Sequence, residues 1–152
     1  RLYCYHTTFQ EFADEIAKEE ETYDLIVTNP PFYTDDFETD DQARNKARFT
    51  SSLSFDNLIA GVIKILAKTG KFAVITPFKE AEGFIKLANA KGLLLNRKCD
   101  VQGNIKSAIK RVLMEFSLHQ SEIKEEHLII EIQRHLYTED YINLTKDFYL
   151  KM

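Results

Sequence analysis

Glycine, proline and cysteine are all scarce in this chain. Its 152 residues include 5 glycines and 3 prolines, and no Gly-x-Gly triplet occurs. The sequence therefore contains no glycine-rich loop of the kind that holds nucleotide phosphates. The 2 cysteines, Cys4 and Cys99, lie far apart, which fits neither a zinc motif nor a disulfide framework. We expect reduced thiols in a cytoplasmic protein.

Long apolar segments and metal-ligand patterns are also absent from the sequence. No apolar run approaches the roughly 20 residues that a membrane-spanning helix requires, and no secretory leader is recognisable. The 4 histidines show no spacing with acids or thiols that suits a metal ion. We therefore expect no membrane association and no metal site. The composition, 44% hydrophobic and 29% charged, is that of an ordinary globular domain.

Charge is distributed unevenly along the chain, whose net charge is −4. Residues 9–41 are strongly acidic, with Lys18 as their one base, whereas residues 86–111 contain seven bases and one acid. A negative net charge argues against indiscriminate binding of polyanions. A local basic stretch is nevertheless typical of a nucleic-acid-binding face. From composition alone, a nucleic-acid face and a set of solvated surfaces both remain open.

The spacing of apolar residues predicts alternating strands and helices in one domain. Helices between apolar strands imply crossovers that join parallel strands, so the predicted fold class is α/β with a mostly parallel sheet. The long polar segment 33–54 is expected to be a functional loop. The predicted strands are residues 1–6, 24–28, 71–76, 93–101, 112–118 and 127–132. Capping residues predict helices that start after Thr7 or Thr8, after Ser54 or Asp56, and after Thr138, and a further helix is predicted from residue 80. Gly70 is expected to cap the C-terminal end of the second of these helices along the chain, and Gly92 to end the helix that starts at residue 80. Part of 104–110 is also compatible with helix.

The segment from Asp24 to Phe32 reads Asp-Leu-Ile-Val-Thr-Asn-Pro-Pro-Phe, a short apolar strand that runs into two prolines. Pro30 ends the strand because it donates no ladder hydrogen bond and holds Asn29 in the extended region. Open α/β sheets bind ligands at the carboxyl ends of their strands. The side-chain oxygen of Asn29 and the carbonyl of Pro30 can accept both N–H bonds of an amino group, while Phe32 stacks on its ring. This arrangement predicts a methyl-acceptor pocket for a planar amine.

The same segment resembles motif IV of the class I S-adenosylmethionine-dependent methyltransferases that modify exocyclic or amide nitrogens. The resemblance implies a Rossmann-like sheet and S-adenosylmethionine as the cofactor. Enzymes acting on adenine in DNA and RNA, on guanine in ribosomal RNA and on glutamine in release factors share this motif, so it specifies the chemistry more closely than the substrate. The acceptor-site residues that the resemblance implies are Asn29, Pro30, Pro31 and Phe32.

A narrower resemblance extends over nearly the whole chain. It includes the loop 42–50, the strand 71–76 with its following proline, and the closing segment 141–150. Together these are similar to the bacterial tRNA adenine-N6 methyltransferases that act beside the anticodon of a valine tRNA. The implied partner is tRNA, and an unpaired anticodon-loop base suits recognition in a pocket. The candidate phosphate contacts in the loop are Arg44, Lys46 and Arg48.

The cofactor-binding elements of that family have no counterpart in this sequence. The sheet is therefore expected to lack its first strands, and residues 1–152 to form a single domain, the C-terminal portion of a methyltransferase catalytic domain. Where relatives carry an acid after the third strand, this chain has Thr8. Thr8 and Phe9 are the candidate contacts to the cofactor, and we expect this portion alone to bind it poorly and to be inactive.

Two other functions remain open at this point. One is an N-methyltransferase for a different substrate, namely ribosomal RNA, DNA or a protein glutamine. The other is a non-catalytic RNA-binding domain that keeps the same scaffold.

Overall fold

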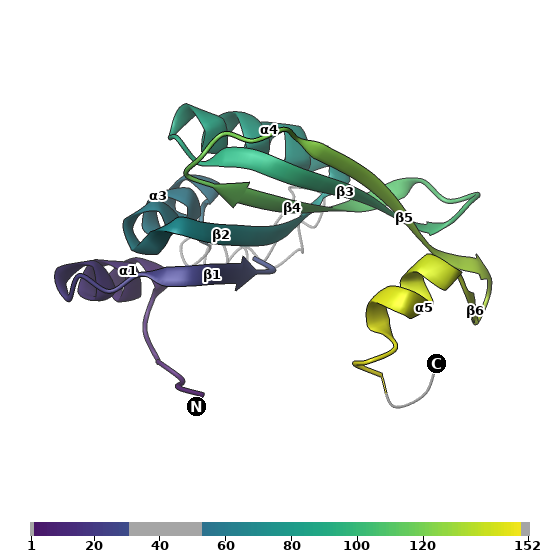
Figure 1. Cartoon of the computed structure of the whole chain (residues 1–152), viewed down its shortest axis with the longest axis horizontal. Coiled ribbons are helices and arrows are strands. Elements are labelled where there is room, and N and C mark those ends of the chain that lie inside the picture. The colour runs from purple at the N-terminus through teal and green to yellow at the C-terminus, as the bar shows by residue number, and fades with distance from the viewer. Residues whose placement is uncertain (1, 31–52, 150–152) are drawn as a thin grey trace, which may run out of the picture.

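The computed structural model describes residues 2–30 and 53–149, which form a mixed sheet with helices on both faces (Figure 1). The strands are β1 (Tyr23–Thr28), β2 (Leu66–Pro77), β3 (Leu94–Asn104), β4 (Ile109–Ser117), β5 (Lys124–Gln133) and β6 (Leu136–Tyr137). The helices are α1 (Phe9–Lys18), α3 (Phe55–Ile65), α4 (Phe78–Ala90) and α5 (Glu139–Thr145). The six strands lie in the order β1-β2-β4-β3-β5-β6.

The α/β fold class is confirmed, but the expectation of a mostly parallel sheet is wrong. β1 pairs with β2 and β3 pairs with β5 in parallel. β4 runs antiparallel to both β2 and β3, and β6 runs antiparallel to β5. The cause is the β3–β4 connection: a tight turn follows Asn104, although the sequence there is also compatible with helix. A tight turn returns the chain antiparallel, whereas a parallel partner requires a longer crossover.

The strand predicted for residues 1–6 is also absent. Residues 2–6 form no helix or strand, and Leu2 is 97% exposed. The pattern of apolar and aromatic residues suits a strand, but a strand exists only where a neighbour supplies hydrogen-bond partners. Within the described chain, β1 pairs on one side alone, with β2.

Three helix starts predicted from capping residues are confirmed. Thr8 caps α1, Ser54 caps α3 and Thr138 caps α5, and each side chain accepts a backbone N–H from the first turn of its helix. Gly92, at φ +85°, follows α4 as expected. The prediction for Gly70 is wrong. α3 ends at Ile65, and Gly70 lies buried within β2, where the chain passes close to β1.

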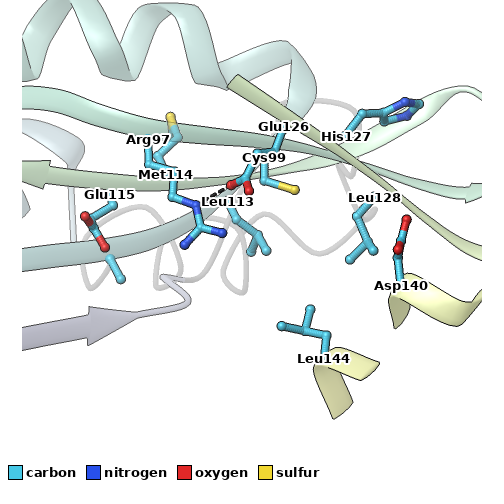
Figure 2. A pocket seen from close by; sticks show the side chains of 11 residues that line it. Arg97, Cys99, Leu113, Met114, Glu115, Glu126, His127, Leu128, Asp140 and Leu144 are labelled. Carbon is cyan, nitrogen blue, oxygen red and sulfur yellow. Dashed lines mark hydrogen bonds and ion pairs between the residues drawn. The ribbon is translucent and has the colours of Figure 1, made fainter. Parts of the chain in front are cut away.

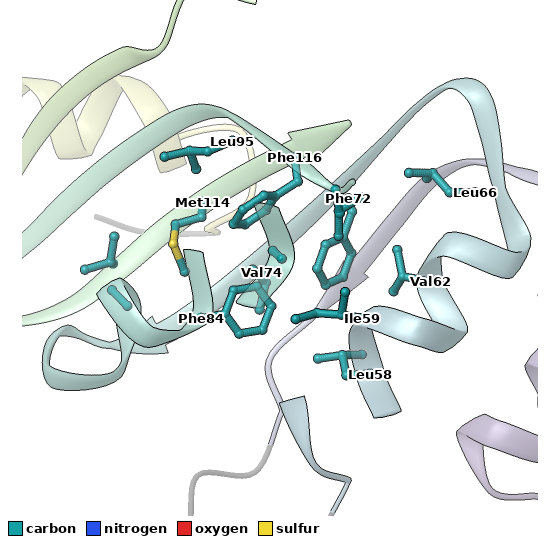
Figure 3. Close-up of a cluster of buried hydrophobic side chains, with 14 residues drawn as sticks. Leu58, Ile59, Val62, Leu66, Phe72, Val74, Phe84, Leu95, Met114 and Phe116 are labelled. Atoms are coloured by element: carbon teal, nitrogen blue, oxygen red, sulfur yellow. The ribbon is translucent and has the colours of Figure 1, made fainter. Parts of the chain in front are cut away.

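The core lies between the sheet and the helices α3 and α4. Three phenylalanines fill its centre, and their ring centroids are 5.6–6.4 Å apart (Figure 3). They are Phe72 on β2, Phe84 on α4 and Phe116 on β4. Because every second residue of a strand points to the same face, Val74 and Thr76 of β2 are buried on this side as well. The core therefore anchors β2 as far as Thr76, and Ile26 of β1 packs against it.

The opposite face of the sheet is more open. In the part of the chain that is described, α5 is the helix that packs on this face, against β5 (Figure 1). Leu25 and Val27 of β1 are 59% and 69% exposed there, and no residue of β1 is fully buried. None of the described helices combines the length and apolar character that crossing a membrane requires.

Candidate active site

The candidate acceptor turn lies directly after β1. Thr28, the last residue of β1, is aligned with Val74 of β2 in the parallel ladder. Asn29 follows and is exposed, whereas Pro30 is buried. The buried proline anchors the turn and the amide next to it remains accessible, which is the arrangement that an acceptor site requires. Pro31 and Phe32 lie outside the described residues.

The end of the neighbouring strand β2 lies at the same edge of the sheet. β2 runs parallel to β1 and ends at Pro77, and α4 begins at the next residue with no side-chain cap. Thr76 precedes this proline and is fully buried. Among the described residues it is the one buried polar side chain, and its hydroxyl has no hydrogen-bond partner. Sequence reasoning missed Thr76, because a single threonine at the end of an apolar strand gives no signal of its burial.

The geometry supports positioning rather than proton abstraction as the chemistry of the turn. An amide oxygen and a backbone carbonyl are neutral acceptors that can orient an amino group without ionising. An amine nitrogen held by two such acceptors presents its lone pair in a fixed direction, which lowers the barrier to alkylation through orientation. The exposed side chain of Asn29 is therefore able to hold a planar amine at the carboxyl edge of the sheet.

The two residues predicted to contact a cofactor both have structural roles. The Thr8 hydroxyl accepts from the backbone N–H of Glu11 (3.3 Å) and donates to its carboxylate (2.8 Å). Hydrogen bonds from the Thr8 side chain, the Thr8 backbone and Thr7 lower the pKa of Glu11. The ring of Phe9 lies against Gly61 of α3. Thr8 and Phe9 therefore form no nucleotide cradle by themselves, and their contact with a cofactor stays a prediction.

The residues predicted to bind RNA divide into two groups. The loop bases Arg44, Lys46 and Arg48 lie outside the described residues. The basic stretch 86–111 is described and extends over α4, β3 and the start of β4. Ion pairs engage Lys86, Lys91, Arg97 and Lys98, with Glu82, Asp56, Glu126 and Asp100 respectively. The remaining bases lie at or next to the β3–β4 turn and are Lys106, Lys110 and Arg111.

A cavity of about 540 Å³ lies between α5 and the open face of the sheet (Figure 2). Its walls include the ion pair between Arg97 and Glu126 as well as apolar side chains such as Leu113. Burial raises the pKa of the Cys99 thiol, which also lines it. Neither Asn29 nor Pro30 borders this cavity. Sequence reasoning did not find it, because its walls come from four strands and a helix that are distant along the chain.

The described residues contain no cluster of three or more histidine, cysteine or carboxylate side chains that could hold a metal ion. No protein-family model matches the chain.

The fold is that of methyltransferases. A predicted O-methyltransferase from Agrobacterium tumefaciens superposes with a TM-score of 0.57 at 14% identity, over 83% of this chain and 52% of that one. The structure of M1.HpyAVI in complex with SAM superposes with a TM-score of 0.50 at 11% identity, over 79% of this chain and 63% of that one. At such low identity these similarities establish the fold alone, and they confirm the expected Rossmann-like methyltransferase architecture.

Sequence similarity is closer to one particular group of methyltransferases. The chain is 46% identical over its full length to a Flavobacterium johnsoniae protein and 41% identical to one from Christiangramia forsetii. A Trichodesmium erythraeum protein is 42% identical over 95% of this chain. All three are named tRNA1(Val) (adenine(37)-N6)-methyltransferase, so the resemblance inferred from the motifs is confirmed. The chain spans 64%, 63% and 59% of the length of these three relatives.

Proposed function

We propose that the full-length protein transfers a methyl group from S-adenosylmethionine to the exocyclic N6 of an adenine in a tRNA anticodon loop. The observation that carries the proposal is the exposed Asn29 beside the buried Pro30, at the end of a strand that runs parallel to its neighbour. The names of the relatives supply the substrate, since all of those described above are tRNA adenine-N6 methyltransferases.

In this proposal the residues of the chain act on the acceptor. Asn29 and the Pro30 carbonyl hold the two N–H bonds of adenine N6, and Phe32 stacks on the base extruded from the loop. Arg44, Lys46 and Arg48 contact phosphates, which position an RNA without reading its sequence. The positive charge that develops on the nitrogen faces two neutral oxygens, an electrostatic stabilisation that needs no ionised base.

S-adenosylmethionine would supply the methyl group as an electrophilic sulfonium and would leave as the neutral thioether S-adenosylhomocysteine, while the alkylated nitrogen would lose its extra proton to water. The described residues do not form a cradle for it, because the Thr8 hydroxyl caps α1 and Phe9 packs on Gly61. The proposal therefore assigns the acceptor side of the reaction to this chain. The proposal includes three further points. Thr8 and Phe9 contact the adenine of the cofactor, the protein is cytoplasmic, and residues 1–152 form a single domain that is part of the catalytic domain.

Labelled methyl transfer tests the proposal. The full-length protein is incubated with methyl-labelled S-adenosylmethionine and, separately, with tRNA, ribosomal RNA, DNA and a release factor. We expect label in tRNA alone, on N6 of an anticodon-loop adenine. Label in one of the other pools would identify a different N-methyltransferase, and label in none would leave a non-catalytic domain.

Replacement of the acceptor residue tests the site. We expect Asn29→Ala to lower kcat by about a hundredfold or more, as loss of a transition-state hydrogen-bonding group does in other enzymes. Asn57→Ala is the matched control, since Asn57 is an exposed asparagine that lies in the first turn of α3 and not in the acceptor turn. Unchanged methylation by Asn29→Ala contradicts the assignment of the pocket.

A further inference from the structure

The hairpin that joins β3 to β4 carries the last three bases of the basic stretch. We define the basic hairpin as residues 102–111, which contain Lys106, Lys110 and Arg111 and no acid. In the described part of the chain, Lys106 and Lys110 form no ion pair, whereas the four earlier bases of the stretch all do. Within the described residues, therefore, no acid neutralises the positive charge of these two lysines in an ion pair.

The tip of the basic hairpin is held by its own side chains. The Ser107 hydroxyl accepts from the backbone N–H of Asn104 (3.0 Å) and donates to the Asn104 carbonyl (2.9 Å). The Asn104 side chain accepts from the backbone N–H of Lys106 (3.0 Å), and the Gln102 amide donates to the carbonyls of Ile105 and Ser107. These bonds fix the backbone of the turn, so the lysines are presented from an ordered scaffold with little backbone entropy to lose on binding.

Strand direction places this hairpin at the edge that carries the acceptor turn. β3 is antiparallel to β4 and β4 is antiparallel to β2, so β1, β2 and β3 all run the same way. The chain leaves β1 at Asn29 and enters the hairpin from β3 at this one edge. Arg111 is aligned with Pro77, the last residue of β2, so the hairpin extends beyond the end of β2. Adjacent strands are about 4.8 Å apart, which puts the base of the hairpin about 10 Å sideways from β1.

The surface of the hairpin combines charge with an apolar group. Ile105, at the tip beside Lys106, is 67% exposed. The acid nearest in the strand pairing is Glu131 of β5, which is aligned with Asn104. Lysines beside an exposed aliphatic side chain suit a polyanion that also presents flat apolar surfaces, as a nucleic acid does.

We propose that the basic hairpin binds the phosphate backbone of the RNA next to the nucleotide held at Asn29. The inference rests on the proposed function and adds a second contact surface to it. Phosphate contacts fix the register of an RNA, while the target base is recognised in its pocket. Because residues 1–152 carry a net charge of −4, their contact with phosphates depends on local basic surfaces such as this one.

Charge removal at the hairpin tests the proposal in the full-length protein. The variant is Lys106→Gln with Lys110→Gln. The control is Lys64→Gln with Lys86→Gln, which removes the same charge from α3 and α4, where both lysines are engaged in ion pairs. Binding of unmodified tRNA is measured across a salt series, together with kcat and KM for methylation. Circular dichroism and melting curves verify that both double variants fold.

We expect the hairpin variant to bind tRNA about tenfold more weakly, with kcat within twofold of the unaltered protein. The slope of log affinity against log salt should become shallower by roughly 0.7 to 0.9 for each phosphate that the variant no longer neutralises. The control should match the unaltered protein in affinity and slope. Equal affinity and slope in the two double variants would overturn the inference.

The two proposals can fail separately. If the unaltered protein binds tRNA but methylates none, the proposed function falls, and the salt series still decides whether the hairpin contacts RNA. If Asn29→Ala abolishes methylation while the hairpin variant behaves as the control does, the acceptor site stands and the hairpin surface is rejected. Absence of tRNA binding by the unaltered protein rejects both.

Discussion

The ring of Phe9 on α1 lies directly against Gly61 on α3: a Cβ added at Gly61 would come within 2.5 Å of Phe9 Cε1. The two helices can approach this closely because α3 has no side chain at that position. Phe9 also contacts the cores around both α1 and α3. Its ring therefore connects the helix that precedes β1 with the helix that leads into β2.

This contact predicts the effect of a single methyl group. Gly61→Ala should lower the free energy of unfolding by about 1–3 kcal/mol, because overpacking displaces the Phe9 ring. The matched control is Gly83→Ala on α4, where an added Cβ meets nothing within 4 Å. That change should stabilise by about 0.5–1 kcal/mol through helix propensity. Denaturant melts of the two variants measure the difference, and equal stabilities would contradict the close contact.

Substitution of Gly70 tests a second close contact, in which the neighbouring atom belongs to the backbone. A Cβ there would lie 2.8 Å from the Tyr23 carbonyl oxygen and 2.9 Å from Leu66 Cδ1. The backbone oxygen belongs to the first residue of β1 and cannot rotate away as a ring can. Gly70→Ala should therefore cost at least as much as Gly61→Ala, about 3 kcal/mol, and hydrogen exchange should show weakened protection of β1. Unchanged protection would mean that β1 and β2 tolerate a wider separation.

The sequence predicted correctly those helix starts that depend on contacts between residues close together along the chain. Thr8, Ser54 and Thr138 identified three helix starts because a capping side chain bonds within its own first turn. The direction of β4 was not predictable in this way, since it depends on the turn between Asn104 and Ile109 closing as a hairpin. The predicted strand at residues 1–6 failed for a related reason: a suitable pattern does not supply a pairing partner.

At the candidate site, too, features that depend on neighbouring residues were predictable, whereas contacts between distant elements were not. The position of Asn29 at a strand end followed from an apolar run and a proline, both of which are local. The pairing of Lys91 and Arg97 could not be foreseen, because Asp56 and Glu126 reach them from other elements. Lys86 and Lys98, in contrast, pair with acids four and two residues away along the chain. The basic stretch of the sequence is, in the structure, a set of ion pairs and a single basic hairpin.

The buried hydroxyl of Thr76 predicts an unusual gain in stability. A buried polar atom without a partner costs about 1–3 kcal/mol relative to a satisfied one. Thr76→Val replaces the hydroxyl by a methyl group of similar size, so the free energy of unfolding should rise by about 1 kcal/mol. Val74→Thr, at a buried valine on the same strand and the same face, should lower it by a comparable amount. Loss of stability in Thr76→Val would indicate that the hydroxyl has a partner.

Glu126 predicts a pH dependence of stability. Hydrogen bonds from Arg97 and Lys124 lower the pKa of Glu126 from 4.5 to about 2. Because the folded pKa lies below the unfolded one, the carboxylate stabilises the fold above pH 4.5, and this contribution is lost as the pH falls from 4.5 towards 2. Glu126 is partly exposed and its partners more so, so the contribution at neutral pH should be about 1 kcal/mol or less.

Glu126→Gln measures that contribution directly. The difference in unfolding free energy between the unaltered protein and the variant should be largest at pH 7, shrink below pH 4.5 and weaken with added salt. Glu82→Gln is the control. Lys86 also lowers the pKa of Glu82, but both side chains of that pair are about three-quarters exposed, so its difference should be smaller at every pH. A Glu126→Gln difference that stays constant from pH 7 to pH 2 would mean that Arg97 and Lys124 do not hold the carboxylate in solution.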